Sequence, residues 1–340
     1  MHKGMLLMVS ILVAIMVAVP TLLVSLGGNK PPASAPEPRE KGTSHPSGGP
    51  EVDVYLTREK RLVSLPMEQY IRGVVAAEMP ADFHMEALKA QAFVARTYMA
   101  DRMRREDYSD MKKLGGTAEE AQVTDTVQHQ VYLTDKELKK NWGSRYSVYS
   151  DRIDAAVKET EGQVIQYRGE PIYAAFFSTS NGYTENSEDY FDEKVPYLRS
   201  VVSPWDKVSP KYKAKKTVSV SELASQLQKA TGKQVAVPAS SGGGLLKVVD
   251  RTEGKRISKV RIGDQLFTGR QVREALGLSS TDFTWEIDGK DITLITRGYG
   301  HGVGMSQWGA HLMAEKGKSA QEIIDYYYKG VEIADAGWKK

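Results

Sequence analysis

One acidic side chain stands alone in the apolar segment "VVAAEMPADF". This residue, Glu78, has no charged neighbour between residues 73 and 81. Ile71, Val74 and Val75 precede it by seven, four and three positions, a spacing that places all these side chains on one face of a helix. Since the apolar members must turn this face toward the core, we expect the carboxyl group of Glu78 to be partly removed from water.

Two physical effects should then raise the pKa of this carboxyl group. Burial disfavours the charged form, and the last turn of a helix disfavours negative charge. A carboxyl group that keeps its proton at neutral pH can act as a general acid. The sequence therefore favours Glu78 as a general acid, with a frayed, solvent-facing helix end as the alternative interpretation.

Side chains in other segments could assist this group. Lys89 and Arg96 share one face of the next predicted helix, where Arg96 could orient Glu78 or bind a substrate oxygen through its planar fork. The alternative for both is an ordinary solvated helix face. The segment "FFSTSNGYTENSEDYF", residues 176–191, offers hydroxyl groups and an amide that could bind sugar hydroxyls, or it is simply a polar turn.

A glycine-rich segment, "GYGHGVGMSQWGA", covers residues 298–310 between a predicted strand and a predicted helix. It fits neither the phosphate-binding loop nor the dinucleotide fingerprint. His301 could act as a base or a hydrogen-bond donor, or be structural. Tyr299 and Trp308 could offer flat faces to sugar rings, or fill the core.

The composition excludes several other kinds of site. The chain has 340 residues and no cysteine, so disulfides, thiolate metal sites and a cysteine nucleophile are excluded. Its six histidines are scattered without metal-ligand spacing, and we expect neither a metal nor another cofactor. A formal charge of +3 is too small to indicate a nucleic-acid partner.

The N-terminal segment predicts a membrane location. Residues 5–26 contain no charge and are long enough to cross a bilayer as a helix, so residues 1–27 are interpreted as an uncleaved transmembrane anchor. A cleaved signal peptide is the alternative. Residues 28–50 are rich in Pro, Gly and Ser and are expected to tether a body that lies outside the cytoplasm.

The body is expected to have an α+β fold, with a mixed catalytic core in two parts, residues 51–204 and 289–340. Between them, residues 205–288 are predicted to form a smaller inserted α+β subdomain. Alternating or apolar runs predict strands, and helix-forming runs predict helices. Strands are expected at 52–56, 62–65, 164–169, 172–180, 245–252, 257–263 and 291–298, helices at 66–79, 84–105, 150–161 and 219–232, and an irregular segment at 110–150.

Three segments together resemble the signature segments of the stage II sporulation protein D family, which shares a domain with enhancers of cell-wall amidases. They are "LPMEQYIRGVVAAEMPADFHMEALKAQAFVARTYM", "FFSTSNGYTENSEDYF" and "GYGHGVGMSQWGA". With their order and spacing, the resemblance extends over essentially the whole body.

The resemblance implies a lytic transglycosylase that cleaves peptidoglycan glycan strands between N-acetylmuramic acid and N-acetylglucosamine during forespore engulfment. In such an enzyme one carboxyl group serves as acid and then as base, and a 1,6-anhydro ring closes without water. The implied partners are a sporulation N-acetylmuramoyl-L-alanine amidase (stage II sporulation protein P), which strips the stem peptides, and the membrane scaffold stage II sporulation protein M. The implied location is the mother-cell engulfing membrane, with the body facing the intermembrane space.

The family's catalytic glutamate corresponds to Glu78, and the arginine of its "ARTY" motif corresponds to Arg96. We add Lys89, from the shared helix face, as a substrate-binding residue. Some relatives hold a metal through cysteine, which this chain lacks, so no metal is expected. The other residues that the resemblance assigns to substrate binding are Ser178, Thr179, Ser180, Gly182, Thr184, His301, Ser306 and Gln307.

Two other functions stay open. A lysozyme-type hydrolase would pair Glu78 with a second carboxylate, for which Glu185, Glu188 and Asp189 are the candidates. A non-catalytic glycan-binding protein that activates the amidase is the other alternative. The basic stretch at residues 207–216 could contact the amidase or anionic wall polymers, or serve only solubility.

Overall fold

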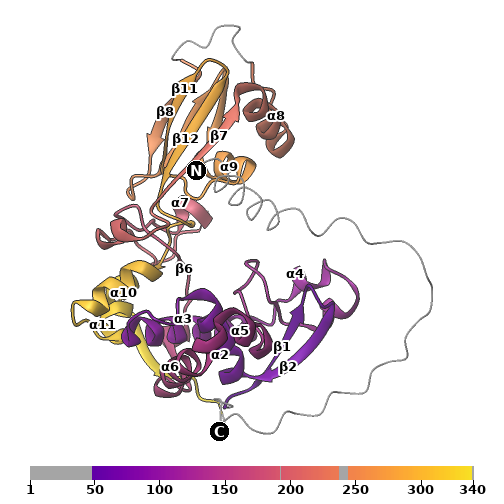
Figure 1. Ribbon diagram of the computed structural model, residues 1–340, viewed down its shortest axis with the longest axis vertical. Helices are drawn as coiled ribbons and strands as arrows, with labels where there is room; N and C mark the ends of the chain where they lie inside the picture. The colour runs from indigo at the N-terminus through magenta and orange to yellow at the C-terminus, as the bar shows by residue number, and fades with distance from the viewer. Residues whose placement is uncertain (1–47, 192, 237–243, 339–340) are drawn as a thin grey trace, which may run out of the picture. The chain divides into compact units, whose positions relative to one another are not determined.

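The computed structural model describes residues 48–191, 193–236 and 244–338 (Figure 1). They form a mixed α+β structure with several small sheets, as the sequence predicts. No helix in these ranges is long and apolar enough to cross a membrane. The predicted anchor, residues 1–27, and all but the last residues of the predicted linker, residues 28–50, lie outside the described part of the chain.

The described part begins with a β-hairpin. Strand β1 (Glu51–Leu56) pairs antiparallel with β2 (Arg61–Pro66), which confirms the predicted hairpin. Val52 and Val54 are fully buried because alternate side chains of a strand point to the same face. The short strand β3 (Val123–Thr124) pairs in parallel with β1.

Helix α2 (Met67–Glu78) follows the hairpin directly. Pro66 precedes its first turn, where a fixed backbone angle costs the helix nothing. The helix ends at Glu78 because Met79 is extended, and Pro80 disfavours a helical conformation in the residue before it. The predicted helix and its stop are thus confirmed, and they place the carboxyl group of Glu78 in the last turn.

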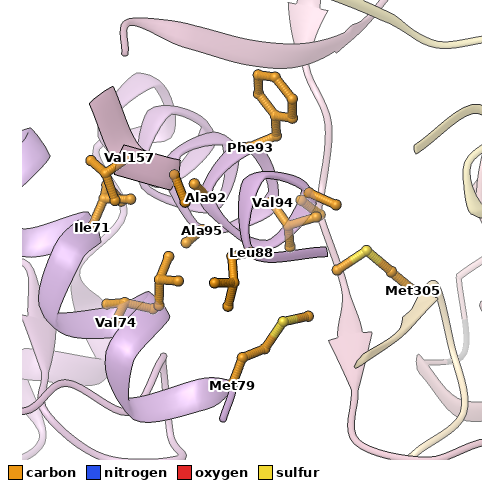
Figure 2. Close-up of a cluster of buried hydrophobic side chains, with 14 of the residues drawn as sticks. Ile71, Val74, Met79, Leu88, Ala92, Phe93, Val94, Ala95, Val157 and Met305 are labelled. Atoms are coloured by element: carbon orange, nitrogen blue, oxygen red, sulfur yellow. The ribbon is translucent and has the colours of Figure 1, made fainter. Parts of the chain in front are cut away.

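Helix α3 (Met85–Arg105) packs against α2 and against α6 (Tyr146–Glu159). Figure 2 shows Val74 of α2, Leu88 of α3 and Val157 of α6 among the side chains that gather between these helices. All three are fully buried. Burial of a side chain of this size contributes about 1.5–3 kcal/mol, so this contact holds the end of α2 firmly in place.

Two small sheets join the C-terminal part of the chain to this helical core. Strand β4 (Gln163–Tyr167) lies between β5 (Glu170–Pro171) and β14 (Glu332–Asp335) and is antiparallel to both. Strand β6 (Phe176–Phe177) pairs in parallel with β13 (Met305–Ser306). The other helical elements associated with this part are α7 (Glu188–Phe191), the 3-10 helix η3 (Trp205–Val208), α10 (Gln307–Glu315) and α11 (Ala320–Tyr327).

A second group of elements surrounds its own hydrophobic cluster, which includes the buried side chains of Leu227, Val272 and Phe283. Its strands form two sheets, ordered β11-β12-β7 and β10-β9-β8, and Figure 1 shows α8 and α9 beside them. The elements are β7 (Lys213–Ser219), α8 (Val220–Thr231), β8 (Leu246–Arg251), β9 (Ile257–Ile262), β10 (Gln265–Thr268), α9 (Gly269–Leu276), β11 (Phe283–Asp288) and β12 (Asp291–Arg297). Strand β12 lies beyond residue 288, where the predicted insertion ends, and the domain boundaries stay a prediction.

The expectation of an irregular segment at residues 110–150 is wrong. Thr134 and Glu137 form a capping box at the start of one of its helices, and Leu138 is the single fully buried side chain of that helix. A helix with so narrow an apolar face leaves almost no periodic signal in the sequence. The elements within or overlapping this segment are α4 (Ser109–Lys112), the 3-10 helices η1 (Gly116–Glu120) and η2 (Gly143–Arg145), β3, α5 (Asp135–Trp142) and the start of α6.

The strand expected at residues 172–180 is also too long. Only β6 (Phe176–Phe177) forms there. The backbone N–H of Ser180 donates instead to a side chain, the carboxylate of Asp206 (2.9 Å), so it is not available to a neighbouring strand.

Candidate active site

The carboxyl group of Glu78 lies at the end of α2 and is half-buried. Its Oε1 accepts a hydrogen bond from the backbone N–H of Val131 (2.8 Å). Val131 belongs to the segment before α5, so a contact across 53 positions of sequence orients the carboxyl group. Ile71, Val74 and Val75 are fully buried on the same helix, in agreement with the predicted face.

Burial is the main cause that raises the pKa of Glu78 above its ordinary value. Hydrogen bonding by Val131 and Gln307 and the positive charge of Lys211 act in the opposite direction. Among the residues that the structure describes, no carboxylate contributes to this shift. The group is therefore a single carboxyl whose proton is retained to higher pH than in water.

Gln307 is the predicted site residue that the structure brings to Glu78. It is the first residue of α10, and its amide nitrogen donates to the backbone carbonyl of Glu78 (3.1 Å) and to Oε1 of Gln91 (3.3 Å). Gln91 belongs to α3 and is fully buried. The glutamine pair thus ties α10 and α3 to the end of α2. Gln91 escaped the sequence analysis because it reads as one more polar residue in a helix.

Ser180 and Ser306 meet at a buried carboxylate, that of Asp206. Asp206 accepts hydrogen bonds from the backbone N–H and the hydroxyl of Ser180, both at 2.9 Å. The hydroxyls of Ser203 and Ser306 also donate to it. Burial raises the pKa of Asp206, and these hydrogen bonds oppose the rise. Ser306 also caps α10, so the Asp206 cluster holds the helix that carries the next residue, Gln307.

The other hydroxyl residues of this loop are also engaged with protein groups. Thr179 exchanges backbone hydrogen bonds with Tyr299, and its hydroxyl lies 3.0 Å from that of Ser209. The hydroxyl of Thr184 accepts from the backbone N–H of Val201 (2.8 Å). These contacts connect the loop to the glycine-rich segment and to the chain near residue 201, and they bring neither threonine into hydrogen-bond contact with Glu78.

Ser178 and Gly182 complete this loop. The carbonyl of Ser178 accepts from the backbone N–H of Trp308 (3.1 Å), and the serine side chain is half-buried. Gly182 has a positive φ of 116°, which a residue with a side chain adopts only with strain. Both residues help shape the loop, and their predicted role in substrate binding stays a prediction.

His301 is surrounded by the rings of Phe177, Tyr190 and Phe191, with centroid separations of 5.3–5.8 Å. Burial, with the positive charges of Arg273 and Arg256, lowers the pKa of His301 to about 3. Its Nδ1 accepts a hydrogen bond from the backbone N–H of Val303 (3.1 Å). The imidazole is therefore neutral at neutral pH and cannot serve there as an imidazolium proton donor.

Arg96 does not contact Glu78. Its guanidinium is fully buried and forms a two-pronged ion pair with Glu68, at 2.8 and 2.6 Å. Lys89 pairs with Glu86 (2.8 Å) and Glu159 (2.5 Å). The expectation that Arg96 orients Glu78 is therefore wrong: the buried carboxylate of Glu68 neutralises this cation, which in water-poor surroundings must be paired. The predicted substrate contacts of Lys89 and Arg96 stay predictions.

The three candidate second carboxylates have partners of their own. Glu188 forms an ion pair with Arg199, which lowers the pKa of Glu188 to about 2. Glu185 is 2% exposed and accepts from the hydroxyl of Thr252 (2.9 Å), and burial raises its pKa to about 7. Asp189 is exposed.

Tyr299 and Trp308, the two aromatic residues of the glycine-rich segment that could contact a sugar ring, differ in their surroundings. Tyr299 is 44% exposed, and the ammonium group of Lys211 lies 5.3 Å from its ring centroid. The positive charge of Lys211 also acts to lower the pKa of Glu78. Trp308 instead packs edge-on against Phe83, with a centroid separation of 4.9 Å. Lys211 comes from the basic stretch, where the sequence alone could not single it out.

No group of three or more potential metal-ligating side chains gathers within the described ranges.

Comparison with known proteins connects this geometry to a family. Residues 55–167 match the family described as stage II sporulation protein. The chain is 43% identical over 343 positions to stage II sporulation protein D of Bacillus subtilis (strain 168), covering 96% of this chain and 94% of that protein. It is 46% identical over 285 positions to stage II sporulation protein D of Bacillus amyloliquefaciens, covering 84% and 79%.

A more distant similarity links the chain to the amidase enhancer of Bacillus subtilis (strain 168). The two are 29% identical over 309 positions, which cover 77% of this chain and 40% of that protein. Together these similarities define a sporulation protein related to an amidase enhancer. The identity and coverage of the first two relatives show that the chain belongs to the stage II sporulation protein D family.

Proposed function

We propose that the protein is a lytic transglycosylase that cleaves peptidoglycan glycan strands between N-acetylmuramic acid and N-acetylglucosamine. The observation that carries the proposal is the environment of Glu78: a half-buried carboxyl group at a helix end, with its pKa raised by burial. Family membership supports the class of substrate, since the resemblance of the signature segments implies it.

In the first step, the protonated carboxyl of Glu78 donates its proton to the glycosidic oxygen. The bond between this oxygen and C1 of N-acetylmuramic acid breaks, and its electron pair leaves with N-acetylglucosamine as a hydroxyl group. In the second step, the carboxylate takes the proton of the 6-hydroxyl of the same N-acetylmuramic acid, whose oxygen bonds to C1. A 1,6-anhydro ring closes, the carboxyl group regains its proton, and no water is consumed.

A single carboxyl group suffices for these two reaction steps. The usual hydrolase needs a second carboxyl group, either as the nucleophile or to activate water. The surroundings of Glu78 support the single-carboxyl role, because no carboxylate among the described residues contributes to its pKa. Two candidates for a second catalytic carboxylate have other partners: Glu188 forms an ion pair with Arg199, and Glu185 accepts a hydrogen bond from Thr252.

The test compares wild type and Glu78→Gln on glycan strands that have been stripped of stem peptides. We expect wild type to produce anhydro ends, which mass spectrometry distinguishes from the reducing ends of hydrolysis. Loss of a general acid should lower the cleavage rate by about 10²–10⁴-fold. Glu188→Gln is the matched control and should cleave normally. Undiminished cleavage by Glu78→Gln would exclude the assignment, and reducing ends alone would indicate a hydrolase.

A second candidate function is amidase activation without cleavage, which is favoured by the similarity to a protein named amidase enhancer. We propose that the chain, anchored by residues 1–27 with its body outside the cytoplasm, also activates the sporulation amidase and works with the membrane scaffold protein named above. Amidase activity measured with the Glu78→Gln variant tests this. Lost glycan cleavage with intact amidase stimulation would show two separable roles.

A further inference from the structure

A cavity of about 530 Å³ lies at the C-terminal end of α3. Its lining comes from residues 101–105, 167–173, 191 and 193–197, and it contains none of the predicted site residues. Ligand-binding cavities in proteins commonly have volumes of about 300–1,000 Å³. The cavity is therefore large enough for a ligand that does not use the Glu78 site.

Aromatic rings form much of its wall. Tyr167 and Tyr197 lie with ring centroids 5.3 Å apart, and Tyr173 meets Phe191 edge-on at 5.6 Å. All four are only partly buried. The hydroxyl of Tyr197 accepts from the backbone N–H of Tyr173 (2.8 Å). The wall thus offers ring faces together with tyrosine hydroxyl groups.

Most charged groups of the wall form ion pairs with one another. Asp101 forms ion pairs with Arg104 (3.1 Å) and Arg105 (2.7 Å), and Arg104 also contacts Glu170 (3.2 Å). Glu193 also lines the cavity and leaves its wall with one net negative charge. Such a wall disfavours an anion, and its N–H groups and carboxylate oxygens can bind hydroxyl and amide groups. A neutral ligand with many hydroxyls and an apolar ring face fits this combination.

A second cavity of about 290 Å³ adjoins the first, because Arg104 and Pro171 line both. It adds the ring of Trp338. We propose that the two cavities form a second saccharide-binding site, for a neutral N-acetylglucosamine unit of a glycan strand, separate from Glu78. The choice of an N-acetylated sugar rests on the proposed function, whereas the existence of a saccharide site rests on the cavity itself.

The site would hold a glycan strand while Glu78 acts elsewhere on the same or another strand. Its contribution should therefore appear in binding and in the use of long strands, not in the chemical step. This expectation separates the two sites experimentally.

The experiment titrates the hexamer of N-acetylglucosamine into the full chain carrying Glu78→Gln, with hydrogen exchange as the reporter of location. We expect protection at residues 167–173 and 191–197, and a loss of affinity of about tenfold when Tyr167→Ala is added. Tyr149→Ala is the matched control, because Tyr149 stacks on Arg145 (4.9 Å) much as Tyr167 stacks on Arg168 (5.2 Å). Cellohexaose, which lacks acetamido groups, should bind more weakly than the N-acetylated probe.

Two further measurements keep the outcome decisive. Tyr173→Phe removes only a hydroxyl group and should also weaken binding, while circular dichroism verifies that each variant is folded. Tyr167→Ala with Glu78 intact should cleave a short soluble glycan at the wild-type rate. Protection confined to the region of residues 78 and 307, or equal affinity of the Tyr167→Ala and Tyr149→Ala variants, would overturn the second site. Binding at Tyr167 without any cleavage by wild type would support the second site and contradict the proposed function.

Discussion

Glu78 and Glu185 share a raised pKa but lie in contrasting surroundings. Glu78 is half-buried at a helix end, and its carboxyl group accepts a hydrogen bond from the backbone N–H of Val131. Glu185 is 2% exposed, with the guanidinium Nε of Arg256 at 3.8 Å. Its surroundings are so tight that a Cβ added to Gly254 would lie 1.8 Å from its Oε1.

The difference teaches that a raised pKa marks burial, whereas a proton donor must also be reachable by substrate. Glu78 combines a raised pKa with partial exposure. Glu185 connects two parts of the chain instead, because Arg256 comes from the element group of the second hydrophobic cluster and also donates to the carbonyl of Gly300 (3.2 Å) in the glycine-rich segment. Two carboxyl groups whose pKa values are both raised by burial can thus lie in surroundings suited to different roles, and the contrast is open to direct test.

The largest expected effect on stability comes from removal of the enclosed carboxyl. Glu185→Ala removes the carboxylate with the largest charge effect on buried Arg256, whose Nε and Nη2 already have no hydrogen-bond partner within the described residues. Breaking such a pair costs about 3–5 kcal/mol, measured by denaturant unfolding. Glycan cleavage per folded molecule should be unchanged. Glu188→Ala, which breaks a partly exposed pair, is the control and should cost about 0–1 kcal/mol. If folded Glu185→Ala lost glycan cleavage, this result would support the alternative of a hydrolase that uses Glu185 as its second carboxylate.

A smaller effect is expected at Gln307. Gln307→Ala removes hydrogen bonds to the carbonyl of Glu78 and to buried Gln91, and unsatisfied buried groups cost about 1–3 kcal/mol each. Cleavage should fall as well, because the end of α2 loses a support. Gln321→Ala, on the exposed face of α11, is the control and should change neither unfolding nor cleavage. A Gln307→Ala variant with wild-type unfolding would show that the glutamine pair is not structural.

The pH dependence of stability should reveal the cost of ionising Glu78. Its folded pKa is raised above 4.5, so the folded protein binds more protons than the unfolded chain, and stability falls as pH rises through the folded pKa. Gln cannot ionise, so Glu78→Gln should be more stable than wild type at about pH 8. This advantage should vanish below pH 4.5, where both states of wild type are protonated. Thermal unfolding across this range measures it, and an advantage that grew toward acid pH would contradict the raised pKa.

The smallest effect concerns Lys211. Its positive charge lowers the pKa of Glu78, so Lys211→Met should raise that pKa and move the basic limb of the pH–cleavage profile to higher pH. Lys207→Met, in the same basic stretch, should leave the profile in place. A shift toward acid pH would contradict this effect of the Lys211 charge on Glu78.

Local sequence patterns predicted the position of Glu78 but not the residues that surround it. The apolar face of α2 and the position of Pro80 placed Glu78 correctly, since helix phase and helix stop depend on neighbouring residues. The helix that carries Arg96 was predicted correctly, but its partner was not. Arg96 pairs with Glu68 and not with Glu78, because the packing of α2 against α3 determines which carboxylate lies beside it. Asp206 gave no local signal at all, although Ser180 and Ser306 meet at it.

The same division holds for the fold. Strongly alternating β1 and the long helix α3 were predicted well, whereas α5, with its single fully buried side chain, was missed. Apolar patterns reveal elements that bury a wide face and conceal those that bury a narrow one.

The sequence alone determined that a solitary carboxyl group would end a core-facing helix, because backbone periodicity and proline act over a few residues. Only the tertiary structure decided what meets that group. Val131 lies 53 positions away and Gln307 lies 229 positions away, and packing brings both to the end of α2. Contacts over such separations depend on how the hydrophobic core closes, which no local pattern contains.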